Sequence, residues 1–419
     1  MPHAPESPDS QEDYPLDAVP EHARKDLWSL SIVLLGFTFF TATMWGGGRL
    51  GAGFSSWASL LTVIALGNAL LGLYVAALGY IAFRTGLNTV LLSRYSFGEW
   101  GSKWPDLAFG LTQIGWYAWG TATSAIILCE LLGLPGPART ALMVFFGLAF
   151  CSTAYVGYRG LEKLSLVAVP LMALLIARSL WQAFGDSGSL AAGSTGPAST
   201  MTFGAGITLV FGTFVSGGTQ ATNWTRFART GRAAVIASLL AFLAGNGLMV
   251  ATGAVGARVY QEADIVRVLA RQGLLIWGIV MLLLNIWTTQ DNTIYNYSIA
   301  GCNFFRTSRR RLLTVAGAVV GTVLALAGMY EWLLPYLILL GTFVPPIGGV
   351  LMADYVARRK TGFPPLDKAG LPKSNPAGIA AYLTGALLAY FSPGVPPVNG
   401  IAGAFVTYLA ADRLLRRTT

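Results

Sequence analysis

Hydrogen-bonding side chains interrupt a long apolar segment near residue 290. After three leucines the chain reads NIWTTQDN, residues 285–292. On a helix, five polar residues of this region would share one face, at spacings i, i+3, i+4, i+7 and i+11: Asn285, Thr288, Thr289, Asn292 and Asn296. Their neutral oxygen atoms suit a hard cation such as sodium better than histidine or cysteine would. The alternative is that the threonine hydroxyls only bond the preceding helical turn.

Aromatic and amide side chains in two other apolar segments could hold a flat ligand. Gln113 and Trp116 stand one helical turn apart in TQIGWY, and Phe214 lies in GTFVSGGTQ, whose glycines and hydroxyls would let a helix unwind. Two rings that sandwich a planar ligand, with the amides of Gln113 and Asn285 at its edge, are typical of nucleobase recognition. Each feature alone is also compatible with helix packing or an interhelical hydrogen bond.

Membrane-spanning helices are the elements that must position these residues. The chain of 419 residues is 54% hydrophobic and 11% charged, against roughly 25% charged residues in a typical soluble domain. Apolar runs of the length that crosses a bilayer, roughly 20 residues, recur along nearly the whole chain. They predict an all-α polytopic membrane protein with twelve spans, near residues 27–48, 57–83, 105–134, 138–157, 161–184, 203–225, 233–256, 274–300, 312–328, 331–357, 376–392 and 397–412.

The basic residues lie mainly on one side of these spans. If the N-terminus is cytoplasmic, the loops on that side carry 22 of the 28 lysines and arginines. Positively charged loops stay in the cytoplasm, so we expect a multi-pass protein of the cytoplasmic (plasma) membrane with both termini inside the cell. This orientation also explains the net charge of +9. We therefore expect the lipid bilayer rather than nucleic acid as a partner, and a monomer.

The interrupted spans occupy matching positions in two halves of the chain. Gly, Thr and Ser interrupt the first and sixth spans, and polar side chains enrich the third and eighth. Interrupted helices at corresponding positions of two groups of five indicate an inverted-repeat transporter with its site at the membrane midplane. The predicted parts are a disordered cytoplasmic tail (1–26), a core (27–357) of two repeats (about 27–184 and 203–357), a cytoplasmic loop (358–375), and two additional helices with a short cytoplasmic C-terminus (376–419).

The residues that an enzyme would need are missing from the predicted spans. Both histidines, His3 and His22, lie in the N-terminal tail, and the three cysteines have no metal-type spacing. Asp291 is the clearest carboxylate within a span; it falls on the flank of the Thr288 face and either supports the site electrostatically or pairs elsewhere. An enzyme would need an acid, base or metal cluster at membrane depth. We therefore expect a transporter without catalytic residues, with a channel or sensor as the alternative.

Seven stretches, in order along the chain, resemble the nucleobase cation symporter family one, and within it the cytosine permease branch. They are ARK near residue 23, LLGFTFFTATMWGGGRLG, LGYIAFRTGLNTVLLSRYSFG, TQIGWY, GTFVSGGTQATNWTRFAR, LNIWTTQDNTIY and VPPIGGVLMADY. The resemblance runs from about residue 20 to the last helix. It implies a leucine-transporter-type fold, with ten core helices in two inverted repeats and broken helices 1 and 6. It also implies sodium-coupled nucleobase uptake by alternating access.

The resemblance also implies a role for particular residues. The base would stack between Trp116 and Phe214, while Gln113 and Asn285 read its edge. The remaining substrate contacts would come from Thr213 and from the backbone near Gly36 and Ser216. Sodium, the co-transported ion, would bind the main-chain oxygens of Gly36 and Phe39 and the side chains of Asn285, Thr288 and Thr289.

Three residues depart from the pattern of the cytosine permeases. Gln290 stands where Asn is expected, Thr213 where Ser is expected, and Asn223 where Asp is expected. The stacking and sodium positions match, so we expect cytosine as the substrate. Another nucleobase or a thiamine-precursor pyrimidine, coupled to sodium or to protons, is the alternative.

Overall fold

The computed structural model describes residues 13–186, 199–358 and 362–418, and over these ranges it is built of helices with a single isolated β-bridge. Helices lie at each segment for which the sequence predicts a span. They are α1 (Leu27–Thr38) with α2 (Thr41–Gly53), α3 (Trp57–Thr85), α5 (Lys103–Leu132), α6 (Gly136–Ala149) with α7 (Cys151–Val156), α8 (Tyr158–Asp186), α9 (Phe203–Thr219) with α10 (Thr222–Thr225), α11 (Gly231–Leu239) with η3 (Leu240–Gly245) and α12 (Asn246–Tyr260), α14 (Leu275–Phe305), α15 (Arg310–Leu326), α16 (Leu333–Phe343) with α17 (Pro345–Ala357), α18 (Pro376–Phe391) and α19 (Pro396–Thr418). Two short helices, α4 (Thr89–Phe97) and α13 (Ile265–Arg271), and the 3₁₀ turns η2 (Glu21–Ala23) and η4 (Met329–Trp332) complete the chain.

Several helices are long and apolar enough to cross a membrane. Among the described residues, five continuous helices meet this condition, and the bent pair α1 and α2 would be a sixth. The helices α5 and α14 are at least as long, with 30 and 31 residues. They do not reach the same apolar character because polar side chains, including those of the predicted site, interrupt them.

The first predicted span is broken in the middle. Helix α1 ends at Thr38 and α2 begins at Thr41, with a bend of 59° between the two helices. Phe39 and Phe40 form the break, and Phe40 has an extended backbone (φ −134°, ψ 129°). The carbonyl groups of the last turn of a helix have no partner within that helix. The break therefore places free main-chain oxygens in the interior of the protein.

The sixth predicted span differs from the expectation of an unwound stretch at its glycines. Helix α9 continues to Thr219, and the chain turns only at Gln220 before α10 begins. A Cβ atom on Gly217 would lie 2.7 Å from the Phe37 ring, and one on Gly218 would lie 2.6 Å from Val75. These glycines therefore let α9 pack closely on α1 and α3.

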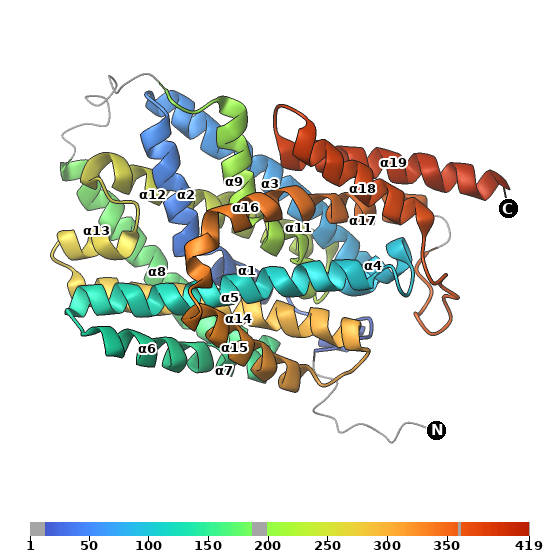
Figure 1. Ribbon diagram of the computed structural model, residues 1–419, viewed down its shortest axis with the longest axis horizontal. Helices are drawn as coiled ribbons and strands as arrows, with labels where there is room; N and C mark the ends of the chain where they lie inside the picture. Colours follow the sequence, from blue (N-terminus) through green and yellow to red (C-terminus); the bar gives the residue numbers. More distant parts are fainter. Residues whose placement is uncertain (1–12, 187–198, 359–361, 419) are drawn as a thin grey trace.

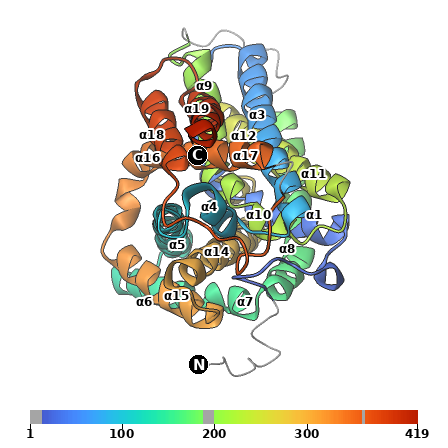
Figure 2. The same cartoon turned by 90° about the vertical axis from the view of Figure 1, so that its right-hand side faces the viewer.

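The helices form two groups that pack mainly within themselves. In the first group, α5, α6, α7, α14 and α15 contact one another, and in the second α3 packs on α9 and α11, while α2 packs on α12. Figures 1 and 2 show the two groups on opposite sides of the molecule, with α18 and α19 beside the second group. Helix α1 contacts α11 of the second group and α14 of the first. The break in α1 therefore faces the boundary between the two groups.

Part of the predicted disordered tail is ordered. Residues 1–12 lie outside the described range, but residues 13–26, which we call the N-terminal strap, follow the ends of the helices. Asp13 is 5% exposed and Val19 is 3% exposed. Polar composition suggested a solvated tail, but backbone hydrogen bonds fix the strap, for example from Val19 N to Gly86 O (2.9 Å) and from Arg229 N to Lys25 O (2.9 Å).

The predicted loop 358–375 packs on α4 over its described part. The main-chain N–H of Glu99 donates to Pro372 O (2.9 Å), and that of Asn375 donates to Phe97 O (2.8 Å). The Tyr95 hydroxyl also donates to Pro364 O. The loop therefore ties α4 to the start of α18.

Candidate substrate and cation site

One of the two predicted threonine hydroxyls of α14, that of Thr289, lies against the end of α1. The Thr289 hydroxyl is 3.4 Å from Phe37 O and 3.5 Å from Phe39 O, across the boundary between the two helix groups. It also donates to Asn285 O at 3.0 Å, and the Thr288 hydroxyl lies 2.9 Å from Leu284 O. Both hydroxyls thus bond the preceding turn. A hydroxyl that donates in this way keeps its lone pairs, so it can still coordinate a cation.

The chemistry of this oxygen cluster fits a hard monovalent cation. The C-terminal end of α1 carries partial negative charge from its aligned peptide dipoles. Neutral hydroxyl and carbonyl oxygens are the ligands that such cations prefer. The end of α1 and Thr289 of α14 therefore bring oxygens of two different helices close together, with Thr288 on the adjacent turn.

Asn285 contacts the region around the break in α1 through both its main-chain oxygen and its side-chain oxygen. Its main-chain oxygen lies near both threonine hydroxyls, at 3.0 Å from Thr289 and 3.3 Å from Thr288. Its side-chain oxygen instead accepts from Thr41 N (2.8 Å) and from the Thr41 hydroxyl (2.6 Å). The carboxamide therefore binds the start of α2 across the break. Sequence reasoning expected the side chain among the sodium ligands and assigned no role to Thr41.

Gly36 lies where α1 passes close to both α8 and α14. A Cβ atom at this position would come within 2.5 Å of the Ser165 hydroxyl of α8 and 3.5 Å of the Thr288 Cβ. The Ser165 hydroxyl is buried and has no hydrogen-bond partner among the described residues. Ser165 is thus a further hydroxyl beside the candidate cation site, and no pattern in the sequence singled it out.

A small internal cavity collects most of the predicted substrate contacts. Its volume is about 20 Å³. It is lined by Phe37, Phe40, Gln113, Trp116, Thr213, Phe214, Ser216, Gly217, Thr289 and Thr293. The cavity therefore brings together the predicted residues Gln113, Trp116, Thr213, Phe214, Ser216 and Thr289. The other predicted residues, Gly36, Phe39, Asn285 and Thr288, lie outside this lining.

Aromatic rings fill the space where a base would stack. The ring of Phe40 lies 5.6 Å from that of Trp116 and 6.4 Å from that of Phe214, in edge-to-face contacts. The remaining 20 Å³ is the space of about one water molecule. A base can therefore enter only if these rings move apart. Phe40 and Phe37 were absent from the predicted site, although their place beside the interrupted stretch was visible in the sequence.

Two buried amides at this site have unused donors. Gln113 is 1% exposed and Asn285 is fully buried. Gln113 Nε2 and Asn285 Nδ2 have no hydrogen-bond partner within the described part of the chain. An unpaired buried donor costs about 1–3 kcal/mol, so a ligand with acceptor atoms on its edge would be favoured here.

A larger vestibule adjoins the small cavity, and we call it the outer vestibule because exposed residues such as Tyr390 line it. Its volume is about 570 Å³, and its walls come from α2, α9, α16 and the turn between α18 and α19. Trp116 and Thr213 line both this vestibule and the small cavity. Those two side chains therefore form the boundary between the vestibule and the candidate site.

Gln290 positions the backbone that carries Trp116. Its Nε2 donates to Trp116 O at 3.1 Å, and the side chain is fully buried. A Cβ atom on Gly120 would overlap this Nε2 atom. Asp291 points elsewhere: it accepts from the Thr153 hydroxyl at 2.9 Å and from Asn292 Nδ2 at 3.0 Å. Asp291 thus pairs with α7 and does not reach the cavity.

Gly120→Ala should therefore lower the thermal stability and the base affinity together. Overpacking of this kind costs about 1–3 kcal/mol, and the displaced amide would disturb the Trp116 backbone. Gln290→Ala removes the overlapping atoms, so the double variant should recover much of the stability. Gly110→Ala is the control, because its Cβ would meet only the Tyr297 ring, at 3.9 Å. Thermal unfolding of the purified variants checks this, and equal melting of the Gly120 and Gly110 variants would contradict it.

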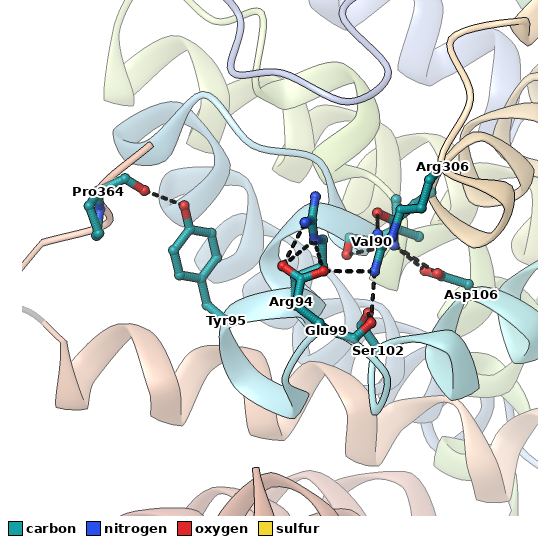
Figure 3. A network of polar contacts seen from close by, with 9 residues as sticks. Val90, Arg94, Tyr95, Glu99, Ser102, Asp106, Arg306 and Pro364 are labelled. Carbon is teal, nitrogen blue, oxygen red and sulfur yellow. Dashed lines mark hydrogen bonds and ion pairs between the residues drawn. The ribbon is translucent and has the colours of Figure 1, made fainter. Parts of the chain in front are cut away.

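A network of polar side chains joins the ends of α5 and α14 (Figure 3). Asn303 Nδ2 donates to both Asp106 oxygens, at 2.9 and 2.7 Å. Arg306 Nη2 donates to Glu99 O at 2.7 Å, and Glu99 also pairs with Arg94 at 2.6 Å. The two helices that carry Trp116 and Thr289 are thereby held to each other. They should move as one unit.

Comparisons with known proteins identify relatives of this chain. A family described as "Permease for cytosine/purines, uracil, thiamine, allantoin" matches residues 18–364. The cytosine permease of Escherichia coli O157:H7 is 40% identical over 402 residues, which cover 96% of this chain and 94% of that protein. The allantoin permease of Bacillus subtilis is 23% identical over 352 residues, which cover 75% of this chain and 71% of that protein.

Solved structures share the fold. Mhp1, a nucleobase-cation-symport-1 family transporter, was solved in a closed conformation with bromovinylhydantoin bound. It matches with a TM-score of 0.83 and 18% identity, covering 99% of this chain and 96% of that chain. A Na⁺-coupled sialic acid symporter in a substrate-bound outward-open state matches with a TM-score of 0.69 and 11% identity, covering 97% of this chain and 92% of that chain.

Proposed function

Because the chain belongs to the family of permeases for cytosine/purines, uracil, thiamine and allantoin, we propose that it is a sodium-coupled symporter that imports a nucleobase, most favourably cytosine. The observation that carries this proposal is the joint placement of Gln113, Trp116, Phe214 and Thr289 around one internal cavity. The E. coli relative at 40% identity, named a cytosine permease, supports the choice of base.

The base would be held by stacking and by edge contacts. Trp116 and Phe214 would take its two faces once the Phe40 ring moves aside. Gln113 and Asn285 would donate to its acceptor atoms, and Thr213, Ser216 and the backbone at Gly36 would complete the contacts. A site with such buried amides discriminates against ligands that leave them unpaired.

Sodium would be bound between the two helix groups and co-transported. The proposed ligands are the main-chain oxygens of Gly36 and Phe39 with Asn285, Thr288 and Thr289. Since Thr289 and Phe39 O already lie 3.5 Å apart, an ion here would join α1 to α14. Binding of the ion would thereby order the break in α1, which also forms one wall of the base site. This is how the ion gradient would be coupled to the base.

The membrane arrangement belongs to the same proposal. The chain would cross the plasma membrane twelve times, with both termini in the cytoplasm. Ten core helices would form two inverted repeats, and the protein would act as a monomer. The first helix would be broken at Phe39 and Phe40, and the sixth at Gln220, between α9 and α10. The outer vestibule then opens to the outside of the cell, so the state described here is outward-facing.

Binding of a base panel to purified protein tests the substrate assignment. We expect cytosine to bind at least about tenfold more tightly in sodium than in potassium. The reason is that a bound sodium ion would order the break in α1, which forms one wall of the base site. Uracil, adenine, allantoin and a thiamine-precursor pyrimidine should bind more weakly. Tighter binding of another base would move the assignment to that base. No binding of any base in either salt would contradict the proposal.

A further inference from the structure

A closed polar seam lies between α10 and α14, on the side of the candidate site away from the outer vestibule. It consists of Asn223, Trp224, Asn292 and Asn296. Each of these side chains is at most 1% exposed. Asn223 Nδ2 donates to Asn296 Oδ1 at 2.6 Å, which joins the two helices directly.

Several polar atoms of the seam have no partner. They are Asn223 Oδ1, Trp224 Nε1, Asn292 Oδ1 and Asn296 Nδ2, counted over the described residues. Burial of unpaired polar groups is unfavourable, so these atoms are available to hydrogen-bond a polar ligand that reaches them. The joined amides of Asn223 and Asn296 leave one acceptor and one donor unused. The unused acceptor and donor are complementary to the donor and acceptor atoms that a nucleobase presents along its edge.

The seam is continuous with the candidate site. Thr293 lines the small cavity and lies three residues, about one helical turn, before Asn296 on α14. The Phe37 ring lies 4.9 Å from the Phe214 ring on the cavity side and 4.9 Å from the Trp224 ring on the seam side. Phe37 therefore separates the cavity from the seam.

The N-terminal strap covers the far end of the seam. The buried Arg226, which follows α10, donates to Asp13 O (2.5 Å) and to Tyr14 O (2.6 Å). Further along, Lys25 N donates to Phe227 O at 2.5 Å. Val19 N also donates to Gly86 O, at the end of α3. The strap is thus attached by its backbone to the second helix group.

The Asp13 carboxylate connects the strap to the first group. Asp13 Oδ2 pairs with Arg310 Nε of α15 at 2.8 Å, with both side chains buried. Arg310 in turn donates to Ala154 O of α7 at 2.6 Å. Asp13 Oδ1 accepts from Tyr158 N of α8 at 3.2 Å, and Gly157, with φ 98°, leaves room for the carboxylate.

We propose that the polar seam is a second, cytoplasmic subsite through which the base leaves the central cavity, and that the Asp13 carboxylate seals it in the outward-facing state. This inference rests on the proposed function. Separation of the two helix groups would break the Asp13–Arg310 pair, open the seam and expose the amides of Asn223 and Asn296 to the departing base.

Cysteine labelling in the full chain tests the seal. Asn296→Cys is placed in a full-length protein whose Cys129, Cys151 and Cys302 are replaced by alanine. Its reaction with a membrane-impermeant maleimide is followed in inside-out vesicles. We expect slow labelling with the strap intact and at least about tenfold faster labelling with Asp13→Asn, because loss of a buried ion-pair partner strongly favours separation. Asp17→Asn is the matched control, since it removes an equal charge from an exposed position of the strap. It should leave the rate unchanged.

Ser298→Cys is the positional control, because Ser298 is equally buried and lies on the opposite face of α14. The thiol at position 298 should stay unreactive toward the maleimide when Asp13→Asn is also present. Faster labelling at both positions would show general loosening and overturn the proposal, as would an unchanged rate at position 296. If Asn296→Cys fails to fold, Asn223→Cys on the facing helix replaces it, with the same outcomes. No base is needed for this readout, so its failure can be told apart from failure of the nucleobase assignment.

Discussion

Thr289→Ala should remove most of the sodium dependence of base binding. The Thr289 hydroxyl is the side-chain group that faces the free carbonyls of Phe37 and Phe39 across the two helix groups. An interaction between a hydroxyl oxygen and a charge contributes about 1.5–3 kcal/mol. The sodium concentration for half-maximal cytosine binding should therefore rise about 10- to 150-fold. Titration of sodium at a fixed concentration of cytosine measures this.

Two control variants show whether the effect comes from the Thr289 hydroxyl itself. Thr289→Ser retains the hydroxyl and should preserve sodium dependence to within about threefold. Thr314→Ala removes a buried hydroxyl that donates to Arg310 O at 3.0 Å on α15, outside the site. It should leave sodium dependence unchanged. A Thr289→Ala protein with the same sodium titration as the Thr314→Ala protein would exclude Thr289 as an ion ligand.

Trp116→Ala should weaken base binding even at saturating sodium. The indole lines the cavity and forms its boundary with the vestibule. Stacking of a base on an aromatic ring contributes about 1–3 kcal/mol, so the Kd for cytosine should rise about 5- to 150-fold. Equilibrium binding of labelled cytosine to the purified variant checks this value. Trp116→Phe, which keeps a ring, should lose less.

Trp119→Ala is the matched control for the stacking experiment. Trp119 lies on the same helix and contacts Phe40 with ring centroids 5.4 Å apart, but it lines neither cavity. Its loss should change the Kd for cytosine by less than about threefold. If Trp119→Ala weakened binding as much as Trp116→Ala, the effect would reflect disturbed packing of α5 and not stacking.

The positions of the helices were predictable because each long apolar run must form a helix to satisfy its backbone in a membrane. The residue types of the site were predictable for a related reason. Polar side chains such as Gln113 and Thr289 are costly at membrane depth, so their clustering in the third and eighth spans indicated a site. The family resemblance, which the comparisons confirm, added the positions near Gly36 and Phe39.

Tertiary contacts determine the features of the fold and the candidate site that the sequence did not predict. Phe40 fills the stacking space because the break in α1 directs its ring toward Trp116, and apolar patterning does not specify that direction. The helix through Gly217 persists because its glycines meet Phe37 and neighbouring rings. The strap is ordered by Arg226 and Arg310, which lie far from Asp13 in the chain. Polar composition alone therefore gave the wrong expectation for residues 13–26.

Uptake into liposomes tests the central claim of sodium-driven nucleobase import most directly. Purified protein is reconstituted, and radiolabelled cytosine is followed under an inward sodium gradient or an equal potassium gradient. We expect transient accumulation of cytosine above the external concentration with sodium, and only equilibration or no uptake with potassium. Accumulation that is equal in the two salts, or that follows a proton gradient in the absence of sodium, would contradict it.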